Sequence, residues 1–415
     1  MATVANPYRE LFSAPGSLAF SITGFIARMP ISMTGIGIIA MLSQMRGDYG
    51  LAGAVSAAFT LSMALIGPQV SRVVDRRGQG RVLLPATGIS VASLGALLLC
   101  AHYDAPVWTL FVFAVLAGFM PSMAAMVRAR WSELYSDSPK LHTAFSLESV
   151  IDELTFVVGP ALSVALCTAL FPEAGPLLAV IFLAVGVLLF VAQRKTEPAV
   201  RPPSEAAGGS VISNGAILGL VLTLTAGGVI VGAVDVVSVA FAEDQGSPAA
   251  AGIVISAYAL GSGAAGLLFG MLKLTIPLPR LLLMGTAGTA LTTLPLLIVG
   301  NIATLSVAVF VAGVFFAPTM IVIMGLVEKI VPGSKITEGM TWAITGLSIG
   351  VAMGAAVSGE AVDRFGPDGG FTVAVIAGAF ALLVAALGYR LLTTRVREAE
   401  RAGEQERTAA APSQV

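Results

Sequence analysis

Three carboxylates stand close together in the stretch SLESVIDELTFVVGP, residues 146–160, whose flanking residues are apolar. Glu148 and Asp152 are four residues apart and share one helix face, while Glu153 points about 100° away from Asp152. A charged carboxylate in apolar surroundings is costly unless it is paired with a base, hydrogen-bonded or protonated. The chemistry expected of these groups is therefore ion pairing or reversible proton binding.

The composition predicts that these surroundings are a lipid bilayer. Of the 415 residues, 56% are hydrophobic and 11% are charged, and the mean hydropathy is +0.90. Soluble domains carry about 25% charged residues. We therefore expect an all-α integral membrane protein, because helices satisfy their own backbone groups in lipid. The N-terminus lacks a basic region and a cleavage site, so we expect the first apolar run to be a retained span rather than a signal peptide.

The same numbers bear on other functions. The net charge of −1 says nothing about nucleic acid, because charge in such a chain is sorted by side of the membrane. The two cysteines, Cys100 and Cys167, lie in apolar runs and form neither a disulfide framework nor a metal site. We expect no metal, no cofactor and no enzymatic activity.

Twelve transmembrane helices are expected, since a span needs about 20 apolar residues at 1.5 Å each. The expected spans are 16–44, 51–74, 82–101, 107–128, 142–170 and 176–193, then 216–241, 249–272, 280–299, 302–328, 337–362 and 371–391. This organisation gives an N-terminal six-helix half at 1–193, a cytoplasmic linker at 194–215, a C-terminal six-helix half at 216–391 and a disordered cytoplasmic tail at 392–415.

The basic residues predict a multi-pass protein of the cytoplasmic membrane with both termini in the cytoplasm. With twelve spans, all but three of the 23 lysines and arginines fall on the face that carries the termini. Arg46 and Arg364 fall on the opposite face, and Arg28 lies within the first span. Adding or removing one span would scramble this partition.

Arg28 is the expected partner of the carboxylates in the fifth span. It lies about 18 Å into the first span, and Asp152 lies about 15 Å into the fifth. We expect Arg28 to pair with Asp152 or Glu153, and Glu148 to reach the cytoplasmic edge. Three acids and one base leave a surplus carboxylate in low dielectric, which is a candidate proton-binding site. The alternative is a purely structural ion pair.

The segment SRVVDRRGQGRVLL after the second span resembles the signature of the major facilitator superfamily, G-x-L-A-D-R-x-G-R-[RK]. Ser71 replaces its first glycine, and Gln79 and Gly80 interrupt its basic pair. The gating residues implied by the resemblance are Asp75, Arg76, Arg77, Gly78 and Arg81. A second copy, GEAVDRFG, follows the eleventh span on the outside, with its core at Gly359, Asp363, Arg364 and Gly366.

The resemblance implies a conformational latch. A carboxylate beyond the second span can sit at the N-terminus of another helix, where the helix dipole favours an anion by about 0.3 to 1 kcal/mol. In this superfamily the neighbour is the eleventh helix, which we expect to begin near Thr337. The alternative is a basic loop that only anchors the topology.

A second resemblance concerns the fifth span, where Gly159 and Pro160 are similar to part of the drug-antiporter motif of the same superfamily. The flanking glycines of that motif are absent, and Ala114 stands where the fourth helix would carry its arginine. Arg28 would then supply the missing charge from a different helix.

The resemblance also implies a central cavity lined by spans one, four, seven and ten. Candidate lining residues are Arg28, Pro121, Thr223, Thr225 and Phe315. These spans contain few Asn or Gln side chains, so the cavity favours a hydrophobic small molecule, such as a drug or secondary metabolite, over a sugar.

We therefore expect a monomeric secondary active transporter that exports such a molecule in exchange for protons by alternating access. Its partners would be a small-molecule substrate, protons and the lipid bilayer, without nucleic acid. Two alternatives remain open: uptake of a metabolite by proton symport, and a non-transporting sensor or scaffold with the same fold.

Overall fold

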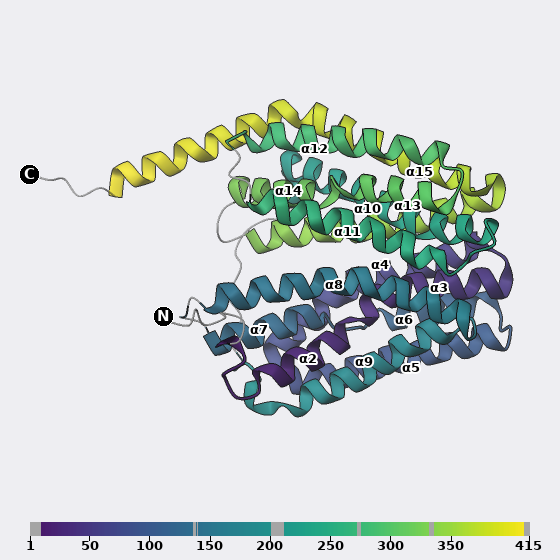
Figure 1. Ribbon diagram of the computed structural model, residues 1–415. Coiled ribbons are helices and arrows are strands. Elements are labelled where there is room, and N and C mark those ends of the chain that lie inside the picture. The colour runs from purple at the N-terminus through teal and green to yellow at the C-terminus, as the bar shows by residue number, and fades with distance from the viewer. Residues whose placement is uncertain are drawn as a thin grey trace, which may run out of the picture.

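The computed structural model describes residues 10–135, 138, 140–200, 211–271, 275–331 and 336–410. The regular elements in these ranges are all helices. Figure 1 shows two helix bundles side by side, one from the N-terminal half of the chain and one from the C-terminal half. The described chain begins and ends at the same end of the molecule, which we call the terminal end; the opposite end is the far end.

Eight helices in the described part of the N-terminal half make six crossings. They are α2 (Ser17–Arg28), α3 (Pro30–Arg46), α4 (Tyr49–Arg77), α5 (Gln79–His102), α6 (Val107–Ala117), α7 (Met123–Tyr135), α8 (Lys140–Ala169) and α9 (Ala174–Ala192). The first crossing breaks between α2 and α3, where Pro30 has no N–H to donate to the preceding turn. The fourth breaks at residues 118–122, which include Gly118 and Pro121.

The C-terminal half repeats this plan. Its elements are α10 (Gly215–Asp244), α11 (Ala250–Met271), α12 (Leu278–Thr293) with the 3₁₀ helix η3 (Leu294–Ile298), α13 (Ile302–Gly313), α14 (Phe316–Ile330) and α15 (Ile336–Ala410). The fourth crossing of this half is also interrupted, between α13 and α14. The break therefore recurs at the equivalent crossing of both halves.

The number of crossings follows from two further details. Ten helical segments are long and apolar enough to cross a membrane, and Val107–Ala117 is a shorter apolar helix. The last of the ten, Glu338–Arg401, contains a non-helical residue at Gly366 (φ 71°, ψ −174°) and makes two crossings. With α6 and α7 as one crossing, the chain crosses twelve times. The predicted all-α integral membrane fold of two six-helix halves is confirmed.

The structure departs from the prediction beyond residue 391. Disorder was expected from 392 onward, but α15 continues to Ala410. Alternating charges support the extra turns: Arg395 pairs with Glu398 at 3.2 Å, and Lys329 of α14 reaches Glu400 at 2.6 Å. Residues 411–415, and residues 201–210 of the expected linker, lie outside the described ranges.

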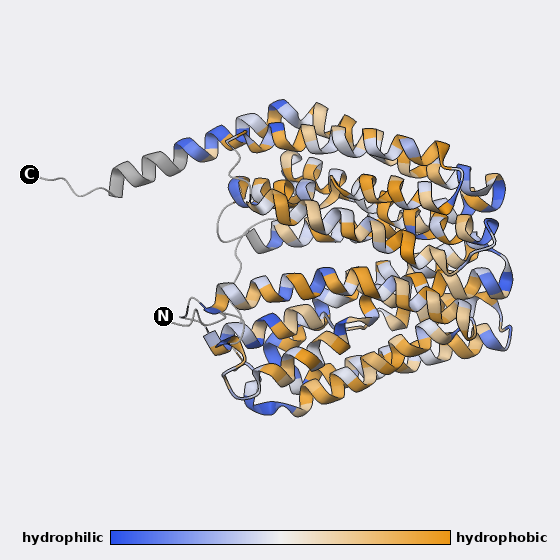
Figure 2. Cartoon of the chain, in the orientation of Figure 1, coloured by the Kyte–Doolittle hydropathy of each residue, from blue (hydrophilic) through white to orange (hydrophobic). Residues whose placement is uncertain are grey.

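Hydropathy is distributed as a bilayer requires. Figure 2 shows hydrophobic residues along most of the helix lengths and hydrophilic residues concentrated toward both ends of the bundle. Large apolar side chains remain exposed on the outer helices, for example Ile298 at 85%, Leu387 at 75% and Leu188 at 58%. In water such a surface would drive aggregation, whereas lipid chains cover it at no cost.

The two halves make their close contacts in the half of the bundle nearer the far end. On α4, a Cβ at Gly53 would lie 2.3 Å from the carbonyl oxygen of Ala355 in α15. Between α8 and α11, Ser256 Oγ donates to the carbonyl oxygen of Val157 at 2.5 Å. Small residues thus let the backbones of the two halves approach closely, as is usual between membrane helices.

Close packing within the C-terminal half gives a first prediction. A Cβ on Gly228 of α10 would lie 2.1 Å from the carbonyl oxygen of Leu347 in α15, so Gly228→Ala should destabilise the protein by about 1 to 3 kcal/mol through overpacking. Gly219 on the same helix has open space around its Cβ position, so Gly219→Ala is the matched control and should be neutral or slightly stabilising. Thermal unfolding in detergent measures both, and equal midpoints would contradict this packing.

Candidate functional site

Arg28 ends α2 at the break in the first crossing, and its side chain is 3% exposed. Its guanidinium forms an ion pair with Glu148, which is completely buried, and a second with Asp152 Oδ1 at 2.8 Å. Both acids come from α8, four residues apart on one helix face. One buried base on α2 therefore pairs with two acids of α8.

Two residues of α7 complete the arrangement. Arg128 pairs with the second carboxylate oxygen of Asp152 at 2.6 Å, and Trp131 Nε1 donates to Glu148 Oε1 at 2.9 Å. We call Arg28, Arg128, Glu148 and Asp152 the charge cluster. Its two bases balance its two acids, and the indole satisfies a further carboxylate oxygen, which is the condition for burying charge in low dielectric.

The structure selects among the partners expected for Arg28. Asp152 is confirmed, but the expectation that Glu148 reaches the cytoplasmic edge is wrong. The predicted depths were counted along the helix axes and ignored the length of the arginine side chain. Arg28 therefore also reaches Glu148, which lies one helical turn before Asp152. Arg128, placed at the cytoplasmic face by sequence, also reaches into the cluster.

Glu153 is the acid that remains outside the charge cluster. It forms no hydrogen bond or ion pair with any residue that the structure describes, and its side chain is directed toward α11. A Cβ on Gly263 of α11 would lie 2.8 Å from a Glu153 carboxylate oxygen. The surplus carboxylate is therefore Glu153, located where the two halves meet.

Sequence reasoning missed Asp235, an acid in the middle of the apolar helix α10. It is partly buried, and among the described residues it has no hydrogen-bonding or ionic partner. Tyr258 of α11 is close enough to interact electrostatically with Asp235. A lone acid within the expected span 216–241 was the available signal, since such residues are rare in membrane helices and usually functional.

The second motif copy forms a latch at the far end. The Asp363 carboxylate accepts hydrogen bonds from the backbone N–H groups of Tyr49, at 3.0 Å, and Gly50, at the start of α4. The next free N–H, that of Leu51, donates to Asp48 at 2.6 Å. These carboxylates satisfy the exposed amides of the helix N-terminus and complement its dipole.

Glu243 adds a second link between the halves at the far end. Its carboxylate accepts hydrogen bonds from the Tyr49 hydroxyl and from Ser43 Oγ, the latter at 3.2 Å. Gly359 of α15 packs so closely that a Cβ there would lie 2.3 Å from the carbonyl oxygen of Tyr49. The far end is closed by these contacts.

The two motif copies share their backbone geometry. Gly78 (φ 87°) and Gly366 (φ 71°), each three residues after the aspartate, are both in the left-handed region that favours glycine. Their aspartates differ in engagement. Asp75 is exposed and makes no hydrogen bond or ion pair within the described ranges, which exclude residues 332–335 just before α15. The contact expected near Thr337 is therefore not among the described contacts.

Arg364 and its neighbours in the motifs lie at the surface. Arg364 pairs with Glu360 one turn earlier on α15. Arg76, Arg77 and Arg81 are exposed near the terminal end. Within the described residues, no group of His, Cys, Asp and Glu has the arrangement of a metal site.

Gly159 and Pro160 lie in the buried face of α8 against α3. A Cβ on Gly159 would lie 1.9 Å from Ser32 Oγ, which itself donates to the carbonyl oxygen of Thr155 at 2.9 Å. In this structure the pair permits a close helix contact beside the charge cluster.

The remaining lining candidates are not brought together with Arg28. Pro121 is buried in the break between α6 and α7. Thr223 lines a small cavity inside the C-terminal half, Thr225 packs against Gly346 of α15, and Phe315 packs against Gly288 of α12. The two threonine hydroxyls donate to carbonyl oxygens of their own helix, at 2.9 Å each.

Twelve crossings in two equivalent halves, with buried charges between helices and a closed far end, define a membrane carrier. Comparison with known proteins identifies its family: the profile of the Major Facilitator Superfamily matches residues 20–245 and 218–414. The chain belongs to this superfamily, and the protein is a multi-pass membrane protein built for secondary transport.

Solved structures share the fold. The nucleoside transporter NupG superposes with a TM-score of 0.69 at 16% identity, over 92% of this chain and 99% of that one. A POT family transporter in complex with a thioalcohol-conjugated peptide gives 0.68 at 12% identity, over 92% and 96%. The POT family transporter PepTSo gives 0.68 at 12% identity, over 93% and 99%. No curated protein matches the sequence.

The charge cluster gives a prediction about stability. Arg28→Met should lower stability by about 3 to 5 kcal/mol, because it leaves the buried Glu148 without its base. Adding Glu148→Gln should recover part of that loss, since the Asp152–Arg128 pair remains neutral. Thermal unfolding of both variants in detergent measures the difference, and a double variant less stable than the single one would contradict the assigned pairing.

The far-end latch gives a prediction about conformation. In a protein carrying Cys100→Ala and Cys167→Ala, a cysteine introduced by Ala355→Cys should resist a membrane-impermeant maleimide, because Ala355 is 3% exposed between the halves. Asp363→Asn should increase the labelling rate several-fold by weakening the contact with α4. Asp368→Asn, which removes a nearby exposed acid, is the control; equal rates in both variants would argue against the latch.

Proposed function

We propose that this protein exports a hydrophobic small molecule in exchange for protons by alternating access. The observation that carries the proposal is Glu153, a carboxylate without a cation at the contact between α8 and α11. Glu153 is exposed in this structure, and enclosing its ionised carboxylate between two apolar surfaces in another state would be costly unless it were hydrated or protonated. Proton binding at Glu153 would therefore favour one relative position of the halves over the other.

The closed far end fits one state of such a cycle. Asp363 and Glu243 hold the halves together there, whereas Asp75 at the terminal end is free of contacts within the described residues. Each motif copy offers a latch at one end, and among the described residues only the Asp363 copy makes its contact. A carrier that closes its ends alternately needs this arrangement.

The orientation in the membrane rests on charge. The terminal end carries most of the lysines and arginines, while Arg46 and Arg364 at the far end are each paired with an acid. Basic residues are retained on the cytoplasmic side during insertion. The terminal end is then cytoplasmic, the membrane is the cytoplasmic membrane, and the structure is closed toward the outside.

The expected substrate class follows from the polar side chains of the C-terminal half. Thr223, Thr225, Thr286 and Thr289 each donate to a carbonyl oxygen of their own helix. Their hydroxyl protons are not free to bind a ligand, whereas the Thr319 hydroxyl, which lines the same cavity as Thr223, has no hydrogen-bond partner among the described residues. A polar substrate would lose its hydrogen bonds to water without gaining replacements from the threonines that donate within their own helix. A hydrophobic molecule therefore suits these helices better.

Proton movement in inside-out membrane vesicles tests the proposal. Respiration acidifies the vesicle lumen and quenches a pH-sensitive dye, and a hydrophobic substrate should restore fluorescence by drawing protons out. Glu153→Gln should abolish this recovery, whereas Asp368→Asn at the far-end surface should retain it. Loss in Asp235→Asn with full recovery in Glu153→Gln would move the coupling acid to α10.

The same assay separates the alternatives. Absence of recovery in the wild type with every compound would count against proton-coupled export. Proton uptake with a polar metabolite in right-side-out vesicles would then indicate symport. A protein that moves neither class of compound would be the sensor or scaffold.

A further inference from the structure

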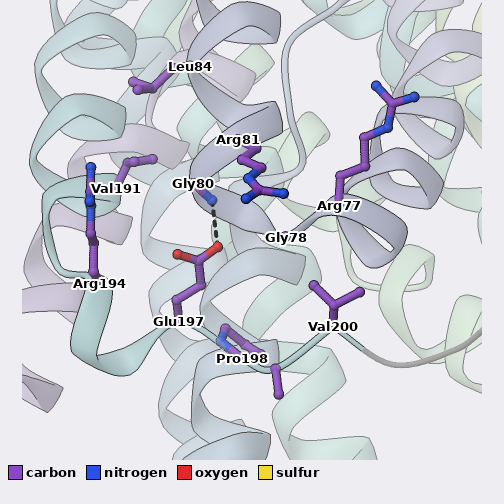
Figure 3. A pocket seen from close by; sticks show the side chains of 11 residues that line it. Arg77, Gly78, Gly80, Arg81, Leu84, Val191, Arg194, Glu197, Pro198 and Val200 are labelled. Atoms are coloured by element: carbon purple, nitrogen blue, oxygen red, sulfur yellow. Dashed lines mark hydrogen bonds between the residues drawn. The ribbon is translucent and has the colours of Figure 1, made fainter.

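We propose that a cavity at the terminal end binds the phosphate of an anionic phospholipid headgroup. The cavity has a volume of about 610 Å³ and lies where α4 ends, α5 begins and the chain leaves α9. Its charged lining residues are Arg77, Arg81, Arg194 and Glu197, and we call it the arginine cavity (Figure 3). It lies outside the charge cluster and the far-end latch.

The arginine cavity has positive charge that the described residues do not neutralise. Arg77, Arg81 and Arg194 form no ion pair or hydrogen bond with any residue in the described part of the chain. Glu197 is the single acid among the lining residues. Three guanidinium groups against one carboxylate leave an excess of positive charge, and a guanidinium binds phosphate oxygens through paired N–H donors.

A fourth guanidinium next to the cavity adds to this excess. Arg130 is 1% exposed and donates to Gln79 Oε1 at 2.9 Å, to the Gln193 carbonyl oxygen at 3.1 Å and to Thr196 Oγ1 at 2.8 Å. All three acceptors are neutral. The Arg130 charge is offset only at longer range, by Glu197.

The backbone presents a further anion-binding feature. Gly78, in its left-handed conformation, turns the chain so that α5 begins at the cavity. The Gly80 N–H, in the first turn of α5, donates to Glu197 Oε1 at 2.7 Å, as Figure 3 shows. An acidic oxygen thus already occupies one position at this positive helix end, and the arginines leave room for another anion.

The apolar surroundings indicate that the anion is a lipid rather than a soluble phosphate. Leu84 lines the cavity and is 41% exposed, and Ile89 continues along α5 at 42%. On the adjacent α9, Leu188 and Leu189 are 58% and 48% exposed. Acyl chains can lie along these side chains while the phosphate stays among the arginines, as expected at the anionic cytoplasmic leaflet.

Native mass spectrometry of the detergent-purified protein tests the proposal. Phosphatidylglycerol and phosphatidylcholine with identical acyl chains would be titrated separately. Phosphatidylglycerol should bind the wild type more tightly, and Arg81→Gln with Arg194→Gln should weaken that binding at least about tenfold. The matched control, Arg72→Gln with Arg76→Gln, removes two exposed arginines of α4 that do not line the cavity and should leave binding near the wild-type level.

Misfolding could explain a variant that loses affinity for the lipid but not one that gains it. Glu197→Gln removes the carboxylate at the helix end and should tighten phosphatidylglycerol binding several-fold. The proposal fails if the two double variants lose affinity equally, since the attraction would then be unspecific. It also fails if glycerol phosphate competes at the affinity of the lipid, because the ligand would then be soluble, or if the two lipids bind equally.

Discussion

The guanidinium of Arg28 sits almost fully buried where the first crossing breaks, and much of the N-terminal half is arranged around it. An isolated charge at that depth would be too costly to keep, so acids must approach it and must themselves be satisfied. Glu148 and Asp152 come from α8, while Trp131 and Arg128 come from α7 to meet them. The need of Arg28 for acids, and of those acids for their own partners, thus constrains how α2, α7 and α8 pack.

The fold was predictable because lipid imposes a simple rule on the chain. Each crossing must be apolar and long enough. The number of crossings follows from the basic residues, because with twelve crossings only Arg46 and Arg364 fall on the face opposite the termini. Helix breaks were less visible: Pro30 and Pro121 lie at two of them, whereas at the interruption between α13 and α14 the proline, Pro318, stands inside the first turn of α14. Continuation of α15 through the charged tail depends on pairs such as Lys329–Glu400, which link separate helices.

The site was only partly predictable, because hydropathy gives depth and not rotation. Arg28 and the acids of α8 were identified from sequence, yet which acid faces the base depends on how α8 turns relative to α2. Glu153 differs from Asp152 by one residue and therefore by about 100°, and it faces α11 instead. The latch shows a further limit: both motif copies can be recognised in the sequence, but the sequence does not show that Asp363 is the aspartate bound to a helix N-terminus in this structure.

Some of the buried or interfacial acids have an ion pair and others do not, and this difference bears on transport. In the charge cluster, each acid is paired with a base. Glu153 and Asp235 have no ion pair among the described residues and are placed on helices that lie at or near the contact between halves. A group whose charge is tolerated in one arrangement and costly in another links its proton to that arrangement. Under the proposed function, stability and proton coupling belong to different carboxylates, which in α8 are the neighbouring residues Asp152 and Glu153.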